Sequence, residues 1–156
     1  MARILTLGAA QTGSVEDGDL RTITESAHAL LDEAARQGVR LLTFGELFLT
    51  PFFANRLEEE FDRYFMRSDD EVLVGLREKA RRNRIALVLP FAERADDGYF
   101  NSAFVYDEEG REAGRYRKTH IPAYFPTEGP GGTGSFEKFY FAAGSKLETF
   151  AVAGTR

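Results

Sequence analysis

The chain has 156 residues, 43% of them hydrophobic, which is enough for one globular domain with a buried core. Its 20 Lys and Arg residues against 25 Asp and Glu residues give a net charge of -5, so nucleic acids and anionic membranes are poor partners. The chain contains no cysteine, which excludes disulfides and thiolate metal sites. With neither a signal-peptide pattern nor an apolar run near the ~20 residues that cross a bilayer, we expect a cytoplasmic protein.

The beginning of the chain has the pattern of a strand, a helix and a second strand. The apolar runs at 3–11 and 39–44 are typical of buried strands. Between them, apolar residues recur at helical spacing. Asp19 is placed to cap this helix at its beginning, and Gly38 is placed to end it.

The rest of the chain continues the alternation of helices and strands as far as residue 118. Further elements are expected as helices near 55–66 and 69–83, a strand at 85–93, and a hairpin with strands 99–107 and 111–118. This order predicts an α/β domain in which helices pack on a mixed sheet. The stretch 119–145 has no clear pattern, and a loop of that length is usually functional, disordered or packed on something outside the chain. A last strand is expected at 146–154, and a chain that stops there looks incomplete.

Glu46 directly follows the strand 39–44, at the carboxyl end where α/β sheets build their sites. Apolar neighbours such as Phe44 and Phe48 would desolvate its carboxyl group, raise its pKa and suit it to act as a general base. A Glu that caps a helix or forms an ion pair is the plainer alternative. Position alone leaves both interpretations open.

Lys118 ends the hairpin in the sequence GRYRKTHIPAYFPTEG, where an ordinary solvated charge is the better interpretation for an arbitrary lysine. Glu137 lies among aromatic residues that would hold its carboxylate in a partly dry pocket, although a rim residue beside Lys138 is equally simple. His28 and His120 are the only histidines, so a metal site is not expected. The glycine-rich stretch 129–134 lacks the Lys-Ser/Thr and the preceding strand of a phosphate-binding loop, and is interpreted as a flexible loop.

Three segments, FGELFLTPFF at 44–53, YFNSAFVYDEEGREAGRYRKTHIP at 99–122 and FEKFYFAAGSK at 136–146, together resemble the nitrilase superfamily of carbon–nitrogen hydrolases. The chain is most similar to the branches that hydrolyse N-carbamoyl amino acids and N-carbamoylputrescine. The resemblance implies a four-layer α-β-β-α sandwich with a mixed sheet, of which 1–156 would be the N-terminal half. It also implies dimers or larger oligomers.

The family's active site is a Glu-Lys-Cys triad, usually with a second Glu. Matched position by position, the resemblance assigns the base to Glu46, the lysine to Lys118 and the second carboxylate to Glu137. It implies a nucleophilic Cys beyond Arg156, no metal or organic cofactor, and a linear amide or ureido substrate. The candidates for the substrate pocket are Phe52, Asn101, His120 and Tyr140.

Two positions depart from the family pattern: Gly45 replaces the usual Pro before the base and loosens that backbone, and Gly144-Ser145 replaces Gly-Asp or Gly-Asn. The leading hypothesis is the N-terminal part of a Cys-dependent amidohydrolase, inactive as this chain alone. The alternative is a non-catalytic half-domain, from a split or decayed enzyme, that binds small amides or pairs with another subunit. The partner protein would be a second copy or a complementary C-terminal half.

Overall fold

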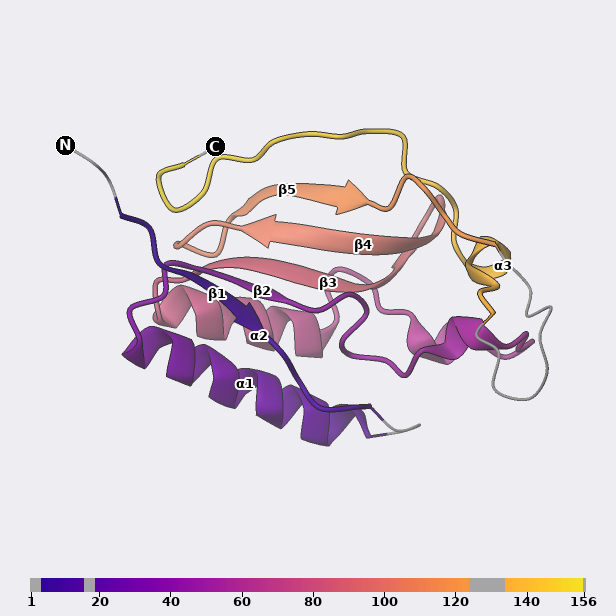
Figure 1. Ribbon diagram of the computed structural model, residues 1–156, viewed down its shortest axis with the longest axis horizontal. Helices are drawn as coiled ribbons and strands as arrows, with labels where there is room; N and C mark the ends of the chain where they lie inside the picture. Colours follow the sequence, from indigo (N-terminus) through magenta and orange to yellow (C-terminus); the bar gives the residue numbers. More distant parts are fainter. Residues whose placement is uncertain (1–3, 16–18, 124–133, 156) are drawn as a thin grey trace.

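The computed structural model describes residues 4–15, 19–123 and 134–155. The elements in chain order are β1(Leu7–Ala10), α1(Leu20–Arg36), β2(Leu41–Phe44), η1(Phe53–Asn55), η2(Asp62–Tyr64), α2(Glu71–Arg82), β3(Ala86–Ala95), β4(Gly98–Tyr106), β5(Glu112–Arg117) and α3(Glu137–Tyr140). The strands form one sheet in the order β1-β2-β3-β4-β5 (Figure 1). The first three strands are parallel and the last two join them antiparallel, so the predicted mixed sheet is confirmed.

Both long helices cover the same face of the sheet (Figure 1). Their apolar residues, among them Leu31 and Leu76, pack on strand residues such as Leu89, and these three side chains are fully buried. Each buried side chain of this size contributes about 1.5–3 kcal/mol to the hydrophobic driving force. One helical layer and one sheet layer make the two-layer half of a four-layer α-β-β-α sandwich.

The opposite face of the sheet is only partly covered. Val88 and Leu41 stay half-buried there, and the segment near the C-terminus packs Phe150 and Val152 against part of this face. The segment runs alongside β5 (Figure 1). A sheet face of this kind presents apolar surface to solvent or to another layer.

The predicted ends of the first helix are confirmed. The Asp19 carboxylate accepts a hydrogen bond from the backbone N–H of Thr22 at 3.3 Å. Gly38 follows the helix with a φ of +71°, a left-handed conformation that glycine adopts without a steric cost. In the second helix Asp70 acts in the same way, accepting from Val72 N at 3.0 Å.

Two predicted elements are wrong. The helix expected near 55–66 is replaced by two single turns, η1 and η2, because its aromatic residues pack into a cluster around Phe53 instead of lining one helix face. The strand expected at 146–154 forms only the isolated bridge Val152–Thr155, since Ala153 and Gly154 both have positive φ and turn the backbone. Within the described residues this segment packs as an extended coil.

Where the structure describes the long segment after β5, it contains one short helix, α3, that the sequence pattern did not indicate. Its neighbours are tied to the sheet: Ala142 N donates to Tyr99 O and Gly144 N donates to Lys118 O, each at 2.8 Å. These bonds bring the α3 region beside the end of β5. The glycine-rich stretch interpreted as a flexible loop lies, except for Gly134, outside the described residues.

Candidate active site

Glu46 lies in the turn that directly follows β2, as the sequence predicted. The next residue, Leu47, has a φ of +52°, a left-handed conformation that costs a branched side chain roughly 1–2 kcal/mol. Leu47 is buried in the aromatic cluster around Phe53, and this packing holds the strained turn in place. The direction in which the chain presents Glu46 is therefore set by packing beneath it.

The structure brings Glu46, Lys118 and Glu137 together from three separate segments. The Lys118 ammonium Nζ lies 2.8 Å from Glu46 Oε1 and 2.8 Å from Glu137 Oε2. The Glu137 side chain is 7% exposed, the Lys118 side chain 24% and the Glu46 side chain 59%. The ammonium is thus held between a buried carboxylate and one that faces solvent.

The pKa of Glu46 differs from the sequence-based expectation. Burial alone would raise the pKa of its carboxyl group, but hydrogen bonds from Lys118 and Asn101, with the Lys118 charge, outweigh burial and hold it below the ordinary value. The donor on Asn101, Nδ2, lies 2.6 Å from Glu46 Oε1. The predicted upward shift is wrong because apolar sequence neighbours do not reveal donors from distant strands. Glu46 is a carboxylate at neutral pH.

Lys118 is held in its charged form. Burial alone would lower the pKa of its ammonium, but hydrogen bonds to Glu137 and Glu46 and the charges of these carboxylates raise it above the ordinary value. A lysine in this state serves as a fixed positive charge and not as a base. An ammonium has three N–H donors, and the two carboxylates take two of them.

Ser135 is a contact that the sequence analysis missed. It is fully buried, and its Oγ donates to Glu137 Oε1 at 3.3 Å, while Glu137 Oε2 faces Lys118. One carboxylate oxygen is therefore held by the hydroxyl and the other by the ammonium. A serine two residues before a glutamate carries no recognisable pattern, so the sequence offered no means of finding it.

Two cavities meet at Glu46. One, of about 390 Å³, lies on the partly open sheet face; its lining includes Asn101, Tyr116 and Lys118. The other, of about 580 Å³, is lined by residues 10–15 and by the turn that carries Glu46, with the half-exposed ring of Phe52 at its rim. Of the pocket candidates, Asn101 and Phe52 therefore lie at cavities that contain Glu46.

Tyr140 and His120 lie elsewhere. The Tyr140 ring is buried in the aromatic cluster, and its hydroxyl accepts from Glu58 N at 2.8 Å and donates to Arg56 O at 2.7 Å. Its polar group is thus used by the backbone of another loop. His120 is exposed, with Nδ1 2.9 Å from Thr119 Oγ1. Neither residue lines the two cavities at Glu46.

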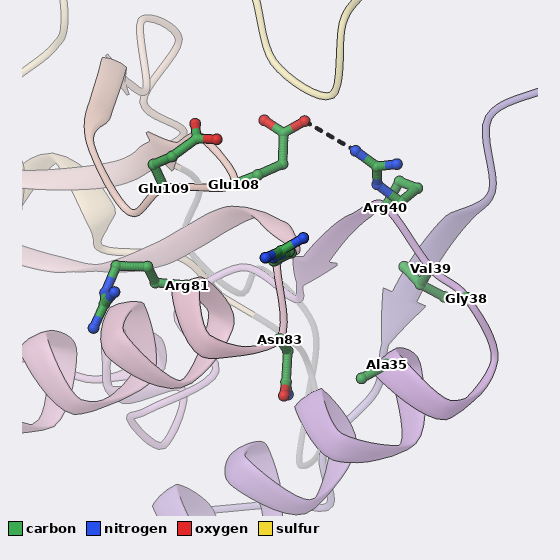
Figure 2. Close-up of a pocket in the computed structure, with 9 residues that line it drawn as sticks. Ala35, Gly38, Val39, Arg40, Arg81, Asn83, Glu108 and Glu109 are labelled. Atoms are coloured by element: carbon green, nitrogen blue, oxygen red, sulfur yellow. Dashed lines mark hydrogen bonds and ion pairs between the residues drawn. The ribbon is translucent and has the colours of Figure 1, made fainter.

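A third pocket, of about 670 Å³, opens at the opposite end of the sheet, where Arg40 precedes β2 (Figure 2). Two of its arginines are paired with carboxylates. Arg40 Nη2 lies 3.3 Å from Glu108 Oε1, and Arg81 Nε lies 2.8 Å from Glu78 Oε2. The amino ends of parallel strands are not where α/β sheets place their ligands, so we assign no site to this pocket.

Within the described ranges, none of the helices has the length and apolar character that a membrane span requires. The same part of the chain holds no group of three or more His, Cys, Asp or Glu side chains suited to a metal ion. The sheet, its helices and the Glu46–Lys118–Glu137 group define an α/β protein with a cleft at the carboxyl ends of its parallel strands. This is the position at which α/β enzymes carry their sites.

The chain belongs to the carbon–nitrogen hydrolase family, whose model matches residues 6–156. Among similar proteins is an N-carbamoylputrescine amidase from Solanum tuberosum, 30% identical over 146 residues that make up 91% of this chain and 44% of the relative. A citrullinase from Francisella tularensis is 30% identical over 114 residues, 72% of this chain and 37% of that protein. The chain thus spans less than half the length of these curated relatives.

Solved structures agree with the fold. A carbon–nitrogen hydrolase from Helicobacter pylori G27 superposes with a TM-score of 0.80 at 26% identity, covering 96% of this chain and 48% of that one. The C. elegans NitFhit protein superposes with a TM-score of 0.72 at 22% identity, covering 98% of this chain and 37% of that one, and at this identity it shows the fold alone. The resemblance inferred from the three sequence segments is confirmed at the level of the family.

Proposed function

We propose that this chain supplies a base, an oxyanion-binding cation and a supporting carboxylate to an amide-hydrolysing site whose thiol nucleophile lies outside residues 1–156. The observation that carries the proposal is the Lys118 ammonium held at 2.8 Å from both Glu46 and Glu137. Family membership supports hydrolysis of a carbon–nitrogen bond. Because the chain contains no cysteine, the proposal puts the nucleophile on another segment.

Each residue has a role that its electrostatics suit. Glu46, a carboxylate at neutral pH, takes the proton of the cysteine thiol, and the thiolate attacks the carbonyl carbon. The oxygen gains negative charge and is stabilised by the third N–H donor of Lys118. The C–N bond breaks as the leaving nitrogen takes the proton from Glu46. Water, deprotonated by Glu46, then hydrolyses the thioester and regenerates the thiol.

Glu137 keeps the cation in place during these steps. Its buried carboxylate balances the charge of Lys118 when Glu46 is protonated and no longer offers a counter-charge. Charge-assisted hydrogen bonds of this kind are about twice as strong as neutral ones. The position of Lys118 thus persists through the proton transfer.

The substrate class is a linear N-carbamoyl compound or a small amide. The name of the potato relative specifies an N-carbamoyl amine, which supports a ureido substrate for the complete site. Its hydrolysis would release ammonia and carbon dioxide. The proposed reaction needs no metal or organic cofactor, because the base and the cation of this chain and the thiol of the complete site are all side chains.

The test compares the chain alone with a chimera. The 156-residue chain is assayed for ammonia release from N-carbamoylputrescine and N-carbamoyl amino acids, and we expect none above the blank. A chimera in which it replaces the matched part of the potato amidase restores the cysteine-bearing half and is expected to be active. Turnover by the chain alone, or a folded but inactive chimera, would contradict the proposal.

A second candidate function is favoured by the partly open sheet face. Half-buried residues on that face, such as Val88, fit a half-domain that pairs with another subunit without itself contributing to catalysis. The coding sequence beyond Arg156 discriminates between the two: a cysteine soon after a strand supports the hydrolase, and its absence from every co-expressed partner supports the pairing module.

A further inference from the structure

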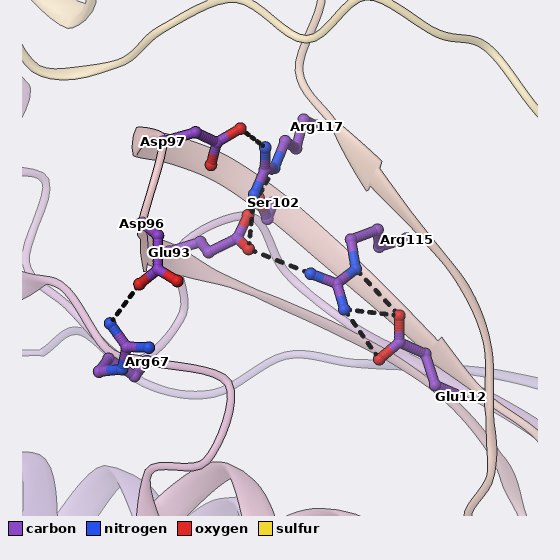
Figure 3. Close-up of polar contacts among 8 residues, drawn as sticks. All are labelled: Arg67, Glu93, Asp96, Asp97, Ser102, Glu112, Arg115 and Arg117. Carbon is purple, nitrogen blue, oxygen red and sulfur yellow. Dashed lines mark hydrogen bonds and ion pairs between the residues drawn. The ribbon is translucent and has the colours of Figure 1, made fainter.

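Glu93 of β3 is a buried carboxylate that the proposed hydrolysis does not use. It is 2% exposed, and Figure 3 shows the polar groups that converge on it. Ser102 Oγ donates to Glu93 Oε2 at 2.6 Å, while Arg117 donates to Oε2 from Nε at 2.8 Å and to Oε1 from Nη2 at 3.0 Å. A buried carboxylate is unfavourable unless a counter-charge and hydrogen bonds compensate it, so these bonds select one geometry.

Arg117, the last residue of β5, is held from further directions. Its Nη1 donates to Asp97 Oδ2 in the β3–β4 turn at 2.9 Å (Figure 3). Its Cζ lies 3.6 Å from the centroid of the Phe100 ring. A guanidinium that forms a two-bond fork to one carboxylate and stacks on an aromatic face is fixed in position and in orientation. The end of β5 is therefore anchored to β3, to the β3–β4 turn and to β4.

The anchor lies directly behind the candidate active site. Arg117 pairs with Ser102 in the β4–β5 register, and both contact Glu93 on the face of the sheet that carries Phe104. Successive strand residues point to opposite faces. Accordingly the next residue, Lys118, and the one before Ser102, Asn101, meet Glu46 on the other face.

Lys118 depends on this anchor more than a lysine in mid-strand would. It lies one residue beyond β5, and its backbone N–H still pairs with Asn101 O at 2.8 Å. Among the described residues β5 pairs with β4 alone, and beyond this ladder the backbone of Lys118 has one further bond, from Gly144 N to Lys118 O at 2.8 Å. The lysine side chain is flexible, so the place of its ammonium between the two carboxylates depends on where the backbone of Lys118 is held.

We propose that Glu93 and Arg117 are positioning residues, which fix the end of β5 from the helix-facing side and so hold the Lys118 ammonium between Glu46 and Glu137. The inference rests on the proposed function only in that Lys118 is the cation of the site. The positioning itself is measured on the lysine, without any hydrolysis.

The sign of the effect separates positioning from electrostatics. Removing the positive charge of Arg117 would, through space alone, raise the pKa of the Lys118 ammonium, and Lys118 would then react more slowly. Releasing Lys118 from its two carboxylates has the opposite effect, because it loses the hydrogen bonds that stabilise the ammonium. An Arg117→Met variant therefore distinguishes the two explanations by the direction in which Lys118 reactivity changes.

The experiment is competitive acetylation of the full chain at pH 9, followed by mass spectrometry, with Lys79 of α2, which pairs with Asp32 away from Arg117, as internal reference. We expect Arg117→Met to raise the Lys118 rate relative to Lys79 by about tenfold, because the released ammonium loses its proton more readily. Arg115→Met is the matched control. Arg115 lies on the same strand and the same face, but its contact with Glu93 is longer, at 3.5 Å. Because Arg115 is bound mainly to Glu112, the Lys118 rate should not change.

A folded Arg117→Met chain whose Lys118 rate is unchanged or lower overturns the proposal. Circular dichroism and thermal unfolding establish that the variant is folded. If it is not, Phe100→Leu decides: it removes the ring face that lies 3.6 Å from Arg117 Cζ and changes no charge, so a smaller rise is expected and an unchanged rate overturns the inference. If acetylation responds as expected while Lys118→Met leaves hydrolysis by the chimera intact, the positioning stands and the proposed function fails.

Discussion

Lys118 Nζ lies 2.8 Å from Glu137 Oε2, and the two residues come from segments 19 positions apart that meet at the end of β5. The contact is the more buried of the two that Lys118 makes, because the Glu137 side chain is 7% exposed and the Glu46 side chain 59%. Replacing Lys118 by Met leaves this carboxylate buried without its cation. We expect the free energy of unfolding at pH 7 to fall by about 1–3 kcal/mol, measured by urea denaturation.

The double variant Lys118→Met/Glu137→Gln tests the cause of that loss. With the buried charge removed, the combined cost should be smaller than the sum of the two single costs by about 0.5–3 kcal/mol. The exposed neighbour Lys138 provides the matched control, since Lys138→Met removes a lysine without touching the site. Strictly additive costs would show that the contact contributes nothing to folding.

Gly45 and Gly144 predict opposite responses to the same substitution. A Cβ at Gly45 would have no atom within 4 Å, and the residue is not among those with positive φ. Gly45→Ala should therefore stabilise the chain by about 0.4–1 kcal/mol through the unfolded state. A Cβ at Gly144 would lie 2.1 Å from Arg117 O, so Gly144→Ala should destabilise it by about 1–3 kcal/mol. Thermal or urea unfolding of both variants that gave the same sign would refute this assignment.

Tyr106 predicts a loss of stability in alkali. Burial, with the nearby charge of Glu112, raises the pKa of its phenol from 10.0 to about 12. Because the folded pKa is raised, the stabilising contribution is fully present below pH 10 and is lost as the pH rises to about 12. The ultraviolet difference between wild type and Tyr106→Phe, recorded after a rapid pH jump, should show one phenol titrating near pH 12. A difference curve centred at the ordinary value of 10.0 would contradict the buried environment.

The partly open sheet face predicts self-association of the lone chain. We expect light scattering to give a mass above that of one chain, or poor solubility, because Val88 and its neighbours expose apolar surface. Val88→Lys should lower the mass. Thr22→Lys, on an exposed position of α1, adds the same charge and should leave it unchanged. A monodisperse wild-type monomer would show that this face needs no cover.

The parts of the fold that local patterns determine could be predicted from the sequence. The first helix needs only its apolar spacing, Asp19 and Gly38, and the structure has all three in place. The segment near 55–66 could not be predicted in this way. Its conformation follows from ring contacts with distant residues, such as Phe61 against Tyr140 at 5.3 Å, which override the helical tendency of its polar residues.

The candidate site was likewise predictable in part. The positions of Glu46, Lys118 and Glu137 were assigned from motifs, and the structure brings them together. The pKa of Glu46 was not predictable, because its donors Asn101 and Lys118 lie 55 and 72 positions away. The direction of a pKa shift in such a site depends on tertiary contacts that no run of neighbouring residues reveals.

The central claim is that Lys118 acts as the cation of an amide-hydrolysing site. The most direct measurement is ammonia release from N-carbamoylputrescine by the chimera with the potato amidase, comparing Lys118→Met with Lys138→Met. We expect Lys118→Met to lower kcat by about 10²–10³, as the loss of an oxyanion donor does, and Lys138→Met to leave it unchanged. A folded Lys118→Met chimera with undiminished kcat would contradict the account.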